Sequence, residues 1–210
     1  MAKTVPFDAH SGRYDEWFRR HDAAYMSELL AVRALLPWQG PSLEVGVGTG
    51  RFAVPLGVQF GLDPSLPMLT RARDRGIHAV QGVAEHLPFK DDAFASVLIV
   101  VTLCFVDDIR AMFDEVSRVL RPGGAFVIGF LDWDSVLGHN YLNRQADRLF
   151  YRQARFYSGL EVEDLLSEQG FGDTSWVQTV FHEPANLSHI EPLRPGRGDG
   201  VFVVVRAYND

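Results

Sequence analysis

Three glycines and two carboxylates stand close together in the first third of the chain. Gly46, Gly48 and Gly50 alternate after a short apolar run that contains Glu44, and Asp63 ends the next such run. Glycine leaves the backbone N–H groups uncovered and tolerates positive φ, so a ligand can lie directly against the main chain. A carboxylate at the end of the second strand of a doubly wound sheet can accept hydrogen bonds from both hydroxyls of a ribose. The layout therefore predicts a site for an adenosine-containing cofactor.

A dinucleotide oxidoreductase is the first alternative, because a glycine loop with a downstream acid is also its signature. Read from Gly46, the fingerprint G-x-G-x-x-G needs its third glycine at position 51, where helix and strand pack closely. The chain has Arg51 there, which argues against a nicotinamide or flavin site. The turn also lacks the lysine and the spacing of a phosphate-binding P-loop, which argues against a nucleotide kinase or ATPase.

Five segments of the chain occur in the order and spacing of one enzyme superfamily. They are E-x-G-x-G-T-G-R at 44–51, G-L-D-P-S-x-x-M-L at 61–69, G-x-A-E-x-L-P-F at 82–89, C-F-V-D-D at 104–108 and V-L-R-P-G-G at 119–124. With them the chain resembles a class I S-adenosylmethionine (SAM)-dependent methyltransferase, and within that superfamily the small-molecule type 11 group, which includes the ubiquinone and menaquinone methyltransferase-like proteins. Each segment alone is a weak signal, but five in order are a strong one.

This resemblance implies SAM as the cofactor and gives expected roles to the matching residues. Glu44 is expected to interact, directly or through water, with the ammonium end of the methionine moiety. The backbone of Gly46 and Gly48 is expected to lie against the methionine and the ribose. Asp63 matches the acceptor of the ribose hydroxyls, and Met68 matches a residue that packs on the adenine.

The adenine edge and the methionine amino group have expected partners further along the chain. Ala84, through its backbone N–H, and Glu85 match the adenine-edge positions, while the main-chain carbonyl of Val100 matches a group near the methionine amino nitrogen. Many relatives have an aspartate where this chain has Val83, and valine cannot accept a hydrogen bond from the adenine amino group. Either Glu85 or a main-chain oxygen takes that role, or the adenine is held more loosely.

Residues before the first strand, or after the fourth and fifth, are candidates for contact with the methyl acceptor. Tyr14 and Trp17 resemble the aromatic lid of relatives, although an amphipathic helix packed on the core explains them nearly as well. Cys104 and Trp133 are the other candidates. Cys104 is also typical of a small buried apolar residue, so we do not interpret it as a nucleophile. The histidines lack ligand spacing, and no metal site is expected.

The sulfonium of SAM carries an already activated methyl group, so the enzyme has to align a nucleophile and exclude water. We therefore expect a methyltransferase that passes the methyl group to a small-molecule acceptor by direct in-line displacement, and we assign no catalytic residue. A non-catalytic SAM-binding regulatory protein is the alternative, because no base stands out. The acceptor, the attacking atom and the oligomeric state are left open.

Apolar periodicity predicts an α/β fold. The resemblance specifies it as a doubly wound, mostly parallel, seven-stranded Rossmann-like sheet whose last strand is antiparallel, with an N-terminal helical lid. The clearest strand is the β-branched run 95–101, and 109–120 has helical spacing ended by P-G-G at 122–124. Ser158 and Glu161 form a capping box. The expected strands are 42–47, a second ending at Asp63, 77–81, 95–101, 125–129, 176–181 and 201–206; the expected helices are 14–36 in two pieces, 65–75, 109–120 and 158–170, with a short or kinked crossover at 51–59 and a loop at 183–199.

Composition agrees with one domain of this class. The 210 residues are 47% hydrophobic, enough for a sizeable core. A net charge of -7 gives no electrostatic footprint for nucleic acid, and one cysteine permits no internal disulfide. No apolar run approaches the length of about 18 residues that a membrane span needs, so we expect a cytoplasmic protein. We divide the single domain 1–210 into a lid (1–37), a cofactor-binding core (41–131), an insertion (132–157) and a C-terminal helix and hairpin (158–210).

Overall fold

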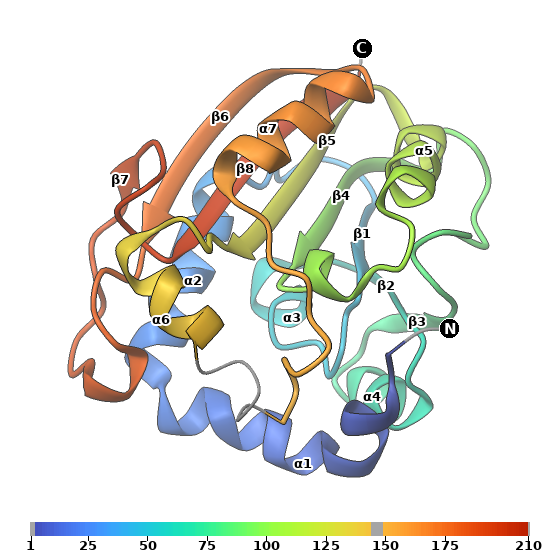
Figure 1. Cartoon of the computed structure of the whole chain (residues 1–210). Coiled ribbons are helices and arrows are strands. Elements are labelled where there is room, and N and C mark those ends of the chain that lie inside the picture. The colour runs from blue at the N-terminus through green and yellow to red at the C-terminus, as the bar shows by residue number, and fades with distance from the viewer. Residues whose placement is uncertain (1–2, 144–148, 210) are drawn as a thin grey trace.

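A twisted sheet with helices on both faces forms the body of the protein (Figure 1). The computed structural model describes residues 3–143 and 149–209, so positions 144–148 of the expected insertion lie outside the described residues. The strands are β1 (Ser42–Val45), β2 (Phe60–Asp63), β3 (His78–Gln81), β4 (Phe94–Val100), β5 (Leu120–Leu131), β6 (Phe171–Thr179), β7 (Arg194–Pro195) and β8 (Phe202–Asn209). The helices are α1 (Val5–Arg20), α2 (Asp22–Leu35), α3 (Ala53–Leu56), α4 (Leu66–Asp74), α5 (Ile109–Val119), α6 (Val136–Asn143) and α7 (Gly159–Glu168), with 3₁₀ turns η1 (Leu103–Phe105) and η3 (Pro184–Asn186).

The strand order is β3-β2-β1-β4-β5-β8-β6-β7. Strands β1 to β5 are parallel, and β8 runs antiparallel between β5 and β6, which confirms the predicted fold class. One strand more than expected is present, because Arg194 and Pro195 pair with β6 inside the segment expected to be a loop. A two-residue strand that contains proline has no periodicity in the sequence to reveal it.

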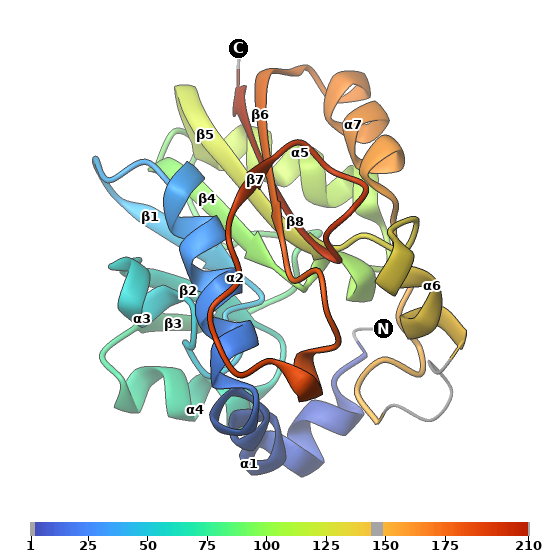
Figure 2. The ribbon, with the colours of Figure 1, turned by 90° about the vertical axis from the view of Figure 1, so that its left-hand side faces the viewer.

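The central strand β4 shows why both faces of the sheet are covered. Its side chains alternate, so that Leu98 and Val100 pack in one core with residues of α2, whereas Val97 and Ile99 pack in the other with residues of α5 and α7. Side chains of successive strand residues point to opposite faces, and an unbroken apolar run therefore needs cover on both. Figure 2 shows α2 on the face opposite to α5 and α7.

The N-terminal helices differ from the expectation at their start. The predicted break is present at His21, between α1 and α2, but α1 begins at Val5, well before residue 14. Pro6 at the first turn is compatible with a helix start. The helix is interrupted at His10, whose φ of -133° and ψ of 31° are not helical.

The remaining helices largely follow the local signals. The crossover at Pro55 is the one-turn helix α3, as predicted, and it ends at Gly57 with φ of 71°. Ser65 caps α4 by accepting from the Met68 amide. Helix α6 was not predicted, and it starts in a turn where Ser135 Oγ accepts from the Gly138 amide at 3.0 Å.

This arrangement brings the ends of several strands to one edge. Strands β1, β2, β4 and β5 are parallel, so the glycine turn, Asp63, Val100 and Leu131 follow or end strands at the same side of the sheet. Helix α1 lies along that side, at the bottom of Figure 1. Among residues 3–143 and 149–209, none of the helices has the length and apolarity that crossing a bilayer requires.

The capping box of α7 offers a test of local stability. Ser158 Oγ accepts from the Glu161 amide at 3.2 Å, and Glu161 Oε2 accepts from the Ser158 amide at 2.7 Å. Replacing Ser158 with alanine should lower the free energy of unfolding by about 1 kcal/mol in urea titrations. Ser167→Ala, at an exposed position on the same helix, is the matched control and should change stability by only a few tenths of a kcal/mol. Equal effects of the two substitutions would contradict a capping role.

Candidate active site

A cavity of about 180 Å³ lies between α1 and the carboxyl ends of the strands. Most of the site residues predicted from the sequence line it, namely Tyr14, Trp17, Gly46, Gly48, Asp63, Met68, Ala84, Glu85 and Val100. Glu44, Cys104 and Trp133 do not. The cavity thus unites the glycine turn after β1, the end of β2 and the end of β4 in one place.

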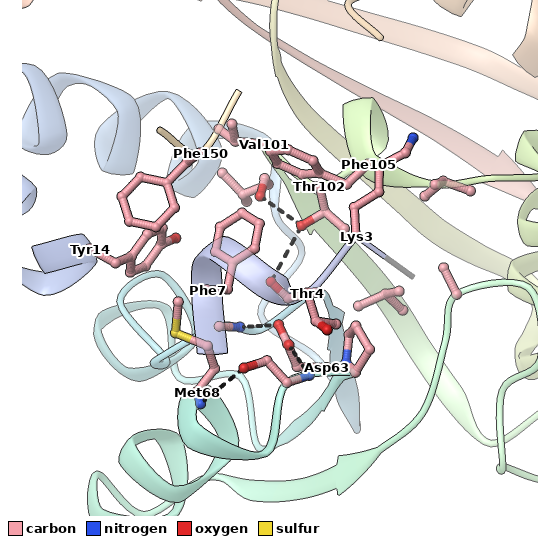
Figure 3. Close-up of a pocket in the computed structure, with 18 of the residues that line it drawn as sticks. Lys3, Thr4, Phe7, Tyr14, Asp63, Met68, Val101, Thr102, Phe105 and Phe150 are labelled. Atoms are coloured by element: carbon pink, nitrogen blue, oxygen red, sulfur yellow. Dashed lines mark hydrogen bonds between the residues drawn. The ribbon is translucent and has the colours of Figure 1, made fainter. Parts of the chain in front are cut away.

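Asp63 links the glycine turn to the start of α4 (Figure 3). Its Oδ2 accepts from the Gly48 amide at 2.9 Å and its Oδ1 from the Ser65 amide at 2.8 Å. A carboxylate oxygen has a second lone pair, so both oxygens can still accept from a ligand in the cavity. Burial raises the pKa of Asp63 to about 6, despite the two amide hydrogen bonds that favour the ionised form. The Asp63 carboxylate therefore accepts hydrogen bonds from two backbone amides and also lines the cavity.

The glycines of the turn have different surroundings. A Cβ added to Gly46, at φ of 76°, would lie 2.2 Å from Thr102 Oγ1, so close packing against the end of β4 requires glycine there. A Cβ added to Gly48, at φ of 52°, would have the Tyr14 side chain as its nearest neighbour, with the hydroxyl oxygen at 3.6 Å, an ordinary contact distance. Gly48 therefore presents its backbone to the cavity beneath Tyr14, as a cradle for a ligand requires.

The end of β4 is held in an uncommon conformation. Val101 has φ of 51°, which a β-branched residue rarely adopts. The following residue, Thr102, can donate from Oγ1 to the carbonyl of Val100 at 3.1 Å or of Gly46 at 3.3 Å. Val101 and Thr102 both line the cavity. Such outliers cluster at binding sites, where surrounding contacts enforce them.

Glu44 lies behind the turn and not on the cavity wall. It is 2% exposed, and Oε2 has no hydrogen-bond partner within the described residues. Burial raises the pKa of Glu44 well above its ordinary value, although a hydrogen bond from the Ala53 backbone opposes this shift. An orphaned buried carboxylate oxygen next to the cradle fits an ammonium group or a bridging water. Its predicted contact with the methionine end of a cofactor stays a prediction.

Cys104 and Trp133 have protein partners of their own. The Cys104 thiol donates to the Val101 carbonyl, and burial raises its pKa to about 12, so it is a thiol at neutral pH. Trp133 Nε1 donates to Glu161 Oε2 at 3.0 Å, which holds the indole against α7. The structure therefore provides no support for their expected contact with a methyl acceptor.

Aromatic side chains from three segments close the cavity (Figure 3). Phe7 lies 5.2 Å, between ring centroids, from both Phe105 and Phe150, and Tyr14 lies 5.8 Å from Phe150. Phe105 stacks in turn on Tyr151 at 5.8 Å. The sequence did not single out Phe7, which precedes the predicted helix, or Phe150 and Tyr151 in the insertion.

An ionic cluster holds α1 over the cavity. Asp15 is paired with Arg51 at 2.8 Å, with Arg75 at 2.6 Å and with Arg71 at 3.4 Å, and it accepts from Thr49 Oγ1 at 2.7 Å. Burial alone would raise the pKa of Asp15, but hydrogen bonds from Arg75 and Arg51 lower it below the ordinary value. Arg51, which argued against a dinucleotide site, thus joins the turn to α1.

Glu28 on α2 is a cavity residue that sequence reasoning missed. It is 6% exposed and lines the cavity. Burial raises its pKa to about 8. The sequence does contain a signal, because this acid stands among Ala24, Ala31 and Val32, which are buried on the face of α2 toward the sheet. The described residues form no cluster of three or more groups able to hold a metal ion.

Comparison with known proteins agrees with this geometry. The family model described as "Methyltransferase domain" matches residues 43–128. A crystal structure of a SAM-dependent methyltransferase, possible histamine N-methyltransferase, from Thermotoga maritima is 44% identical, with a TM-score of 0.95 over 98% of this chain and 99% of that one. An uncharacterized protein of Methanocaldococcus jannaschii is 39% identical over 201 residues, which are 96% of this chain and 97% of that protein.

The demethylmenaquinone methyltransferase of Roseiflexus sp. is 40% identical over 97 residues, which are 41% of each chain. The Thermotoga structure covers both the cofactor-binding half and the C-terminal hairpin of this chain. The sheet architecture is thus shared with a solved methyltransferase over nearly the whole chain, and the glycine turn and Asp63 lie within the residues that the family model matches. The protein belongs to the class I SAM-dependent methyltransferases, in their type 11 group.

Proposed function

We propose that this SAM-dependent enzyme transfers a methyl group to a small organic acceptor by direct in-line displacement. The observation that carries the proposal is the cavity between α1 and the strand ends, which continues from the Gly48 and Asp63 cradle to the aromatic rings of Phe7, Tyr14 and Phe150. The cavity lies under α1 and is lined mainly by apolar and aromatic side chains, which supports a small molecule as its occupant. The alternative of a non-catalytic SAM-binding regulator is not favoured by the family.

We infer the cofactor contacts from the residues that border the cavity. Asp63 would accept from the ribose hydroxyls, Gly48 would lie beneath the methionine and ribose, and Met68, which is 1% exposed, would pack on the adenine. Glu85 already accepts from the amide of Asp107 at 2.8 Å. It would therefore present only its remaining acceptor sites to the adenine edge, where Val83 offers none.

The protein's part in the reaction is to bind, to orient and to exclude water. SAM supplies the activated methyl group on its positively charged sulfur. The aromatic rings of Phe7 and Phe150, 5.2 Å apart, would exclude water from the space near the strand ends, which would strengthen electrostatic interactions there. Alignment of two bound reactants replaces a catalytic base as the main source of rate enhancement.

Isotope transfer tests the proposal directly. The protein is incubated with SAM that carries a tritiated methyl group, together with the small-molecule, protein and nucleic-acid fractions of a cell extract. Label should pass to the small-molecule fraction, and a methyl group made chiral by isotopes should arrive with inverted configuration. Transfer to protein or nucleic acid, or retention of configuration, would refute the corresponding part of the proposal.

The pKa of Asp63 predicts how binding of the product S-adenosylhomocysteine depends on pH. Cofactor hydroxyls would hydrogen-bond to the ionised carboxylate, so binding favours loss of its proton. With a pKa of about 6, affinity should fall about tenfold per pH unit below that pH. The carboxyl and amino groups of the product titrate outside this window. Calorimetric titrations of the wild type should show the slope, and Asp63→Asn should bind weakly without it.

The folded protein alone gives an independent check on the same pKa. A folded-state pKa raised above the unfolded value means that the native state binds more protons between the two, so stability from this group falls as pH rises from about 4 to about 6. Asp63→Asn should remove that contribution from the pH dependence of urea unfolding. An unchanged pH profile in the variant would contradict the raised pKa.

The Asp15 cluster predicts that the lid is fastened by charge. Asp15→Asn removes the negative charge shared by Arg51, Arg71 and Arg75, and should lower the free energy of unfolding by about 1 to 3 kcal/mol. It should also speed proteolysis within residues 3–20. Asp22→Asn, at an exposed position of α2, is the matched control. It should change the free energy of unfolding by no more than a few tenths of a kcal/mol and leave the rate of proteolysis as in the wild type. Equal sensitivity of the two variants to protease would contradict the assignment.

A further inference from the structure

The carboxyl group of Glu28 has no hydrogen-bond or ion-pair partner among the residues that the structure describes. It belongs to α2, is 6% exposed and lines the cavity. Within residues 3–143 and 149–209 no hydrogen bond or ion pair reaches this carboxyl, and burial is the sole cause of its raised pKa. A buried acid without a partner is costly to keep, so its presence on a cavity wall points to a ligand.

The position of α2 places Glu28 at one end of the cavity. This helix packs on β5, β6 and β8. Val32 lies one turn after Glu28 on α2. A Cβ built on Gly129 of β5 would lie 3.5 Å from the side chain of Val32 and 3.5 Å from that of Val100, so Val32 and Val100 lie on the same face of the sheet. The residues expected to hold the adenosine, Asp63 and Met68, come from β2 and α4, on the other side of β1 and β4. Glu28 therefore lies at the end of the cavity away from the adenosine site.

The surroundings of Glu28 favour a cation. The charged groups that line the cavity besides Glu28 are Lys3, Asp63, Glu85 and Asp107, and Lys3 is paired with Asp107 at 3.6 Å. The titratable groups that interact with Glu28 from α1 and α2 are Tyr14 and Tyr25; burial raises the pKa of both phenols, so they stay neutral at pH 7. Trp17 and Phe18 line the cavity as well, and aromatic faces attract cations.

We propose that Glu28 binds a basic nitrogen of the methyl acceptor, so that the enzyme selects small amines with an apolar or aromatic body. The inference rests on the proposed function and names the acceptor class for that site. Glu28 is here a specificity residue: its carboxylate pairs with the ammonium form, or accepts from the amine, while the apolar body contacts the aromatic rings. A neutral molecule of the same shape would leave the buried acid without a partner.

Protonation gives the proposal a readout that does not depend on turnover. With a pKa of about 8, Glu28 is mostly protonated at pH 7 in the empty cavity. An acceptor ammonium entering beside it forces one proton to leave the pair, whether the acid or the amine ends up neutral. Binding should therefore release about 0.9 proton per site at pH 7.

Calorimetry on the protein saturated with S-adenosylhomocysteine tests this inference. The probes are 2-phenylethylamine and the alcohol of the same skeleton, 2-phenylethanol, each titrated in two buffers of different ionisation enthalpy. In the wild type the amine should bind at least about tenfold more tightly and release close to one proton, whereas the alcohol releases none. Equal binding of the amine and the alcohol would overturn the proposal on the wild type alone.

Variants then assign the effect to the residue. Glu28→Gln keeps the shape and should abolish both the amine preference and the proton release, with the affinity for S-adenosylhomocysteine unchanged. Glu16→Gln, the same change outside the cavity on α1, should leave all three as in the wild type. Weakened S-adenosylhomocysteine binding in Glu28→Gln would show instead that Glu28 serves the cofactor's own ammonium and would refute the acceptor assignment.

The same titrations separate this inference from the proposed function. Failure of the wild type to bind S-adenosylhomocysteine would remove both. Normal binding of that product, together with transfer of label to small molecules that lack a basic nitrogen, would remove the role of Glu28 and leave the methyltransferase assignment intact. Glu28→Gln is also expected to melt at a higher temperature than the wild type above pH 8, because a buried charge is absent, which confirms that the variant is folded.

Discussion

The hydrogen bonds that Asp63 accepts from Gly48 and Ser65 hold the site together. They join three segments that local structure alone would leave independent: the turn after β1, the end of β2 and the first turn of α4. Because β1 and β2 are parallel neighbours, with Val45 opposite Leu62, the acid at the end of one strand reaches the amide that follows the other. The register of β1 and β2 therefore sets the geometry of the cradle, and Asp63 also supplies its negative charge.

Buried acids in and beside the cavity are the unusual electrostatic feature of this site. Burial raises the pKa of Glu28 to about 8, of Asp63 to about 6 and of Glu44 well above its ordinary value. Each buried carboxyl lowers the stability of the empty protein at neutral pH, because it either loses the hydration of its charge or has to take up a proton. A sulfonium and an ammonium bring positive charge into the same space. The buried acids thus destabilise the empty protein, and binding of a cationic cofactor would offset this loss. Such a trade-off between stability and function is common at active sites.

Sequence reasoning succeeded where the signal is local. The apolar run of β4 and the Ser158 capping box were recognised because each is encoded within a few neighbouring residues. The cofactor-binding candidates are local as well, since the glycine turn and Asp63 follow consecutive strands. The position of β8 between β5 and β6 required the family resemblance, because strand order depends on contacts between distant segments.

The features that were missed depend on the folded chain. Phe7 and Phe150 meet only after the chain between them has folded, and Asp15 finds Arg75 across the loop that contains β1 and β2. Neither pairing has a period or a spacing in the sequence. Glu28 is different, because an acid within a buried helical stripe can be seen without coordinates, and its meaning becomes clear only when the stripe is found to border a cavity.

Arg51 shows how one residue connects cofactor selectivity with the lid. A glycine at this position would allow the closer helix packing of a dinucleotide site, whereas arginine extends from the turn and pairs with Asp15 of α1. The same aspartate accepts from Thr49 Oγ1, so both the side chain of the turn and the guanidinium hold the helix. The Tyr25 hydroxyl donates to the Arg51 carbonyl at 2.5 Å and ties α2 to the same point. The N-terminal helices therefore belong to the wall of the candidate site, because the glycine turn proposed to bind the cofactor is tied to both α1 and α2.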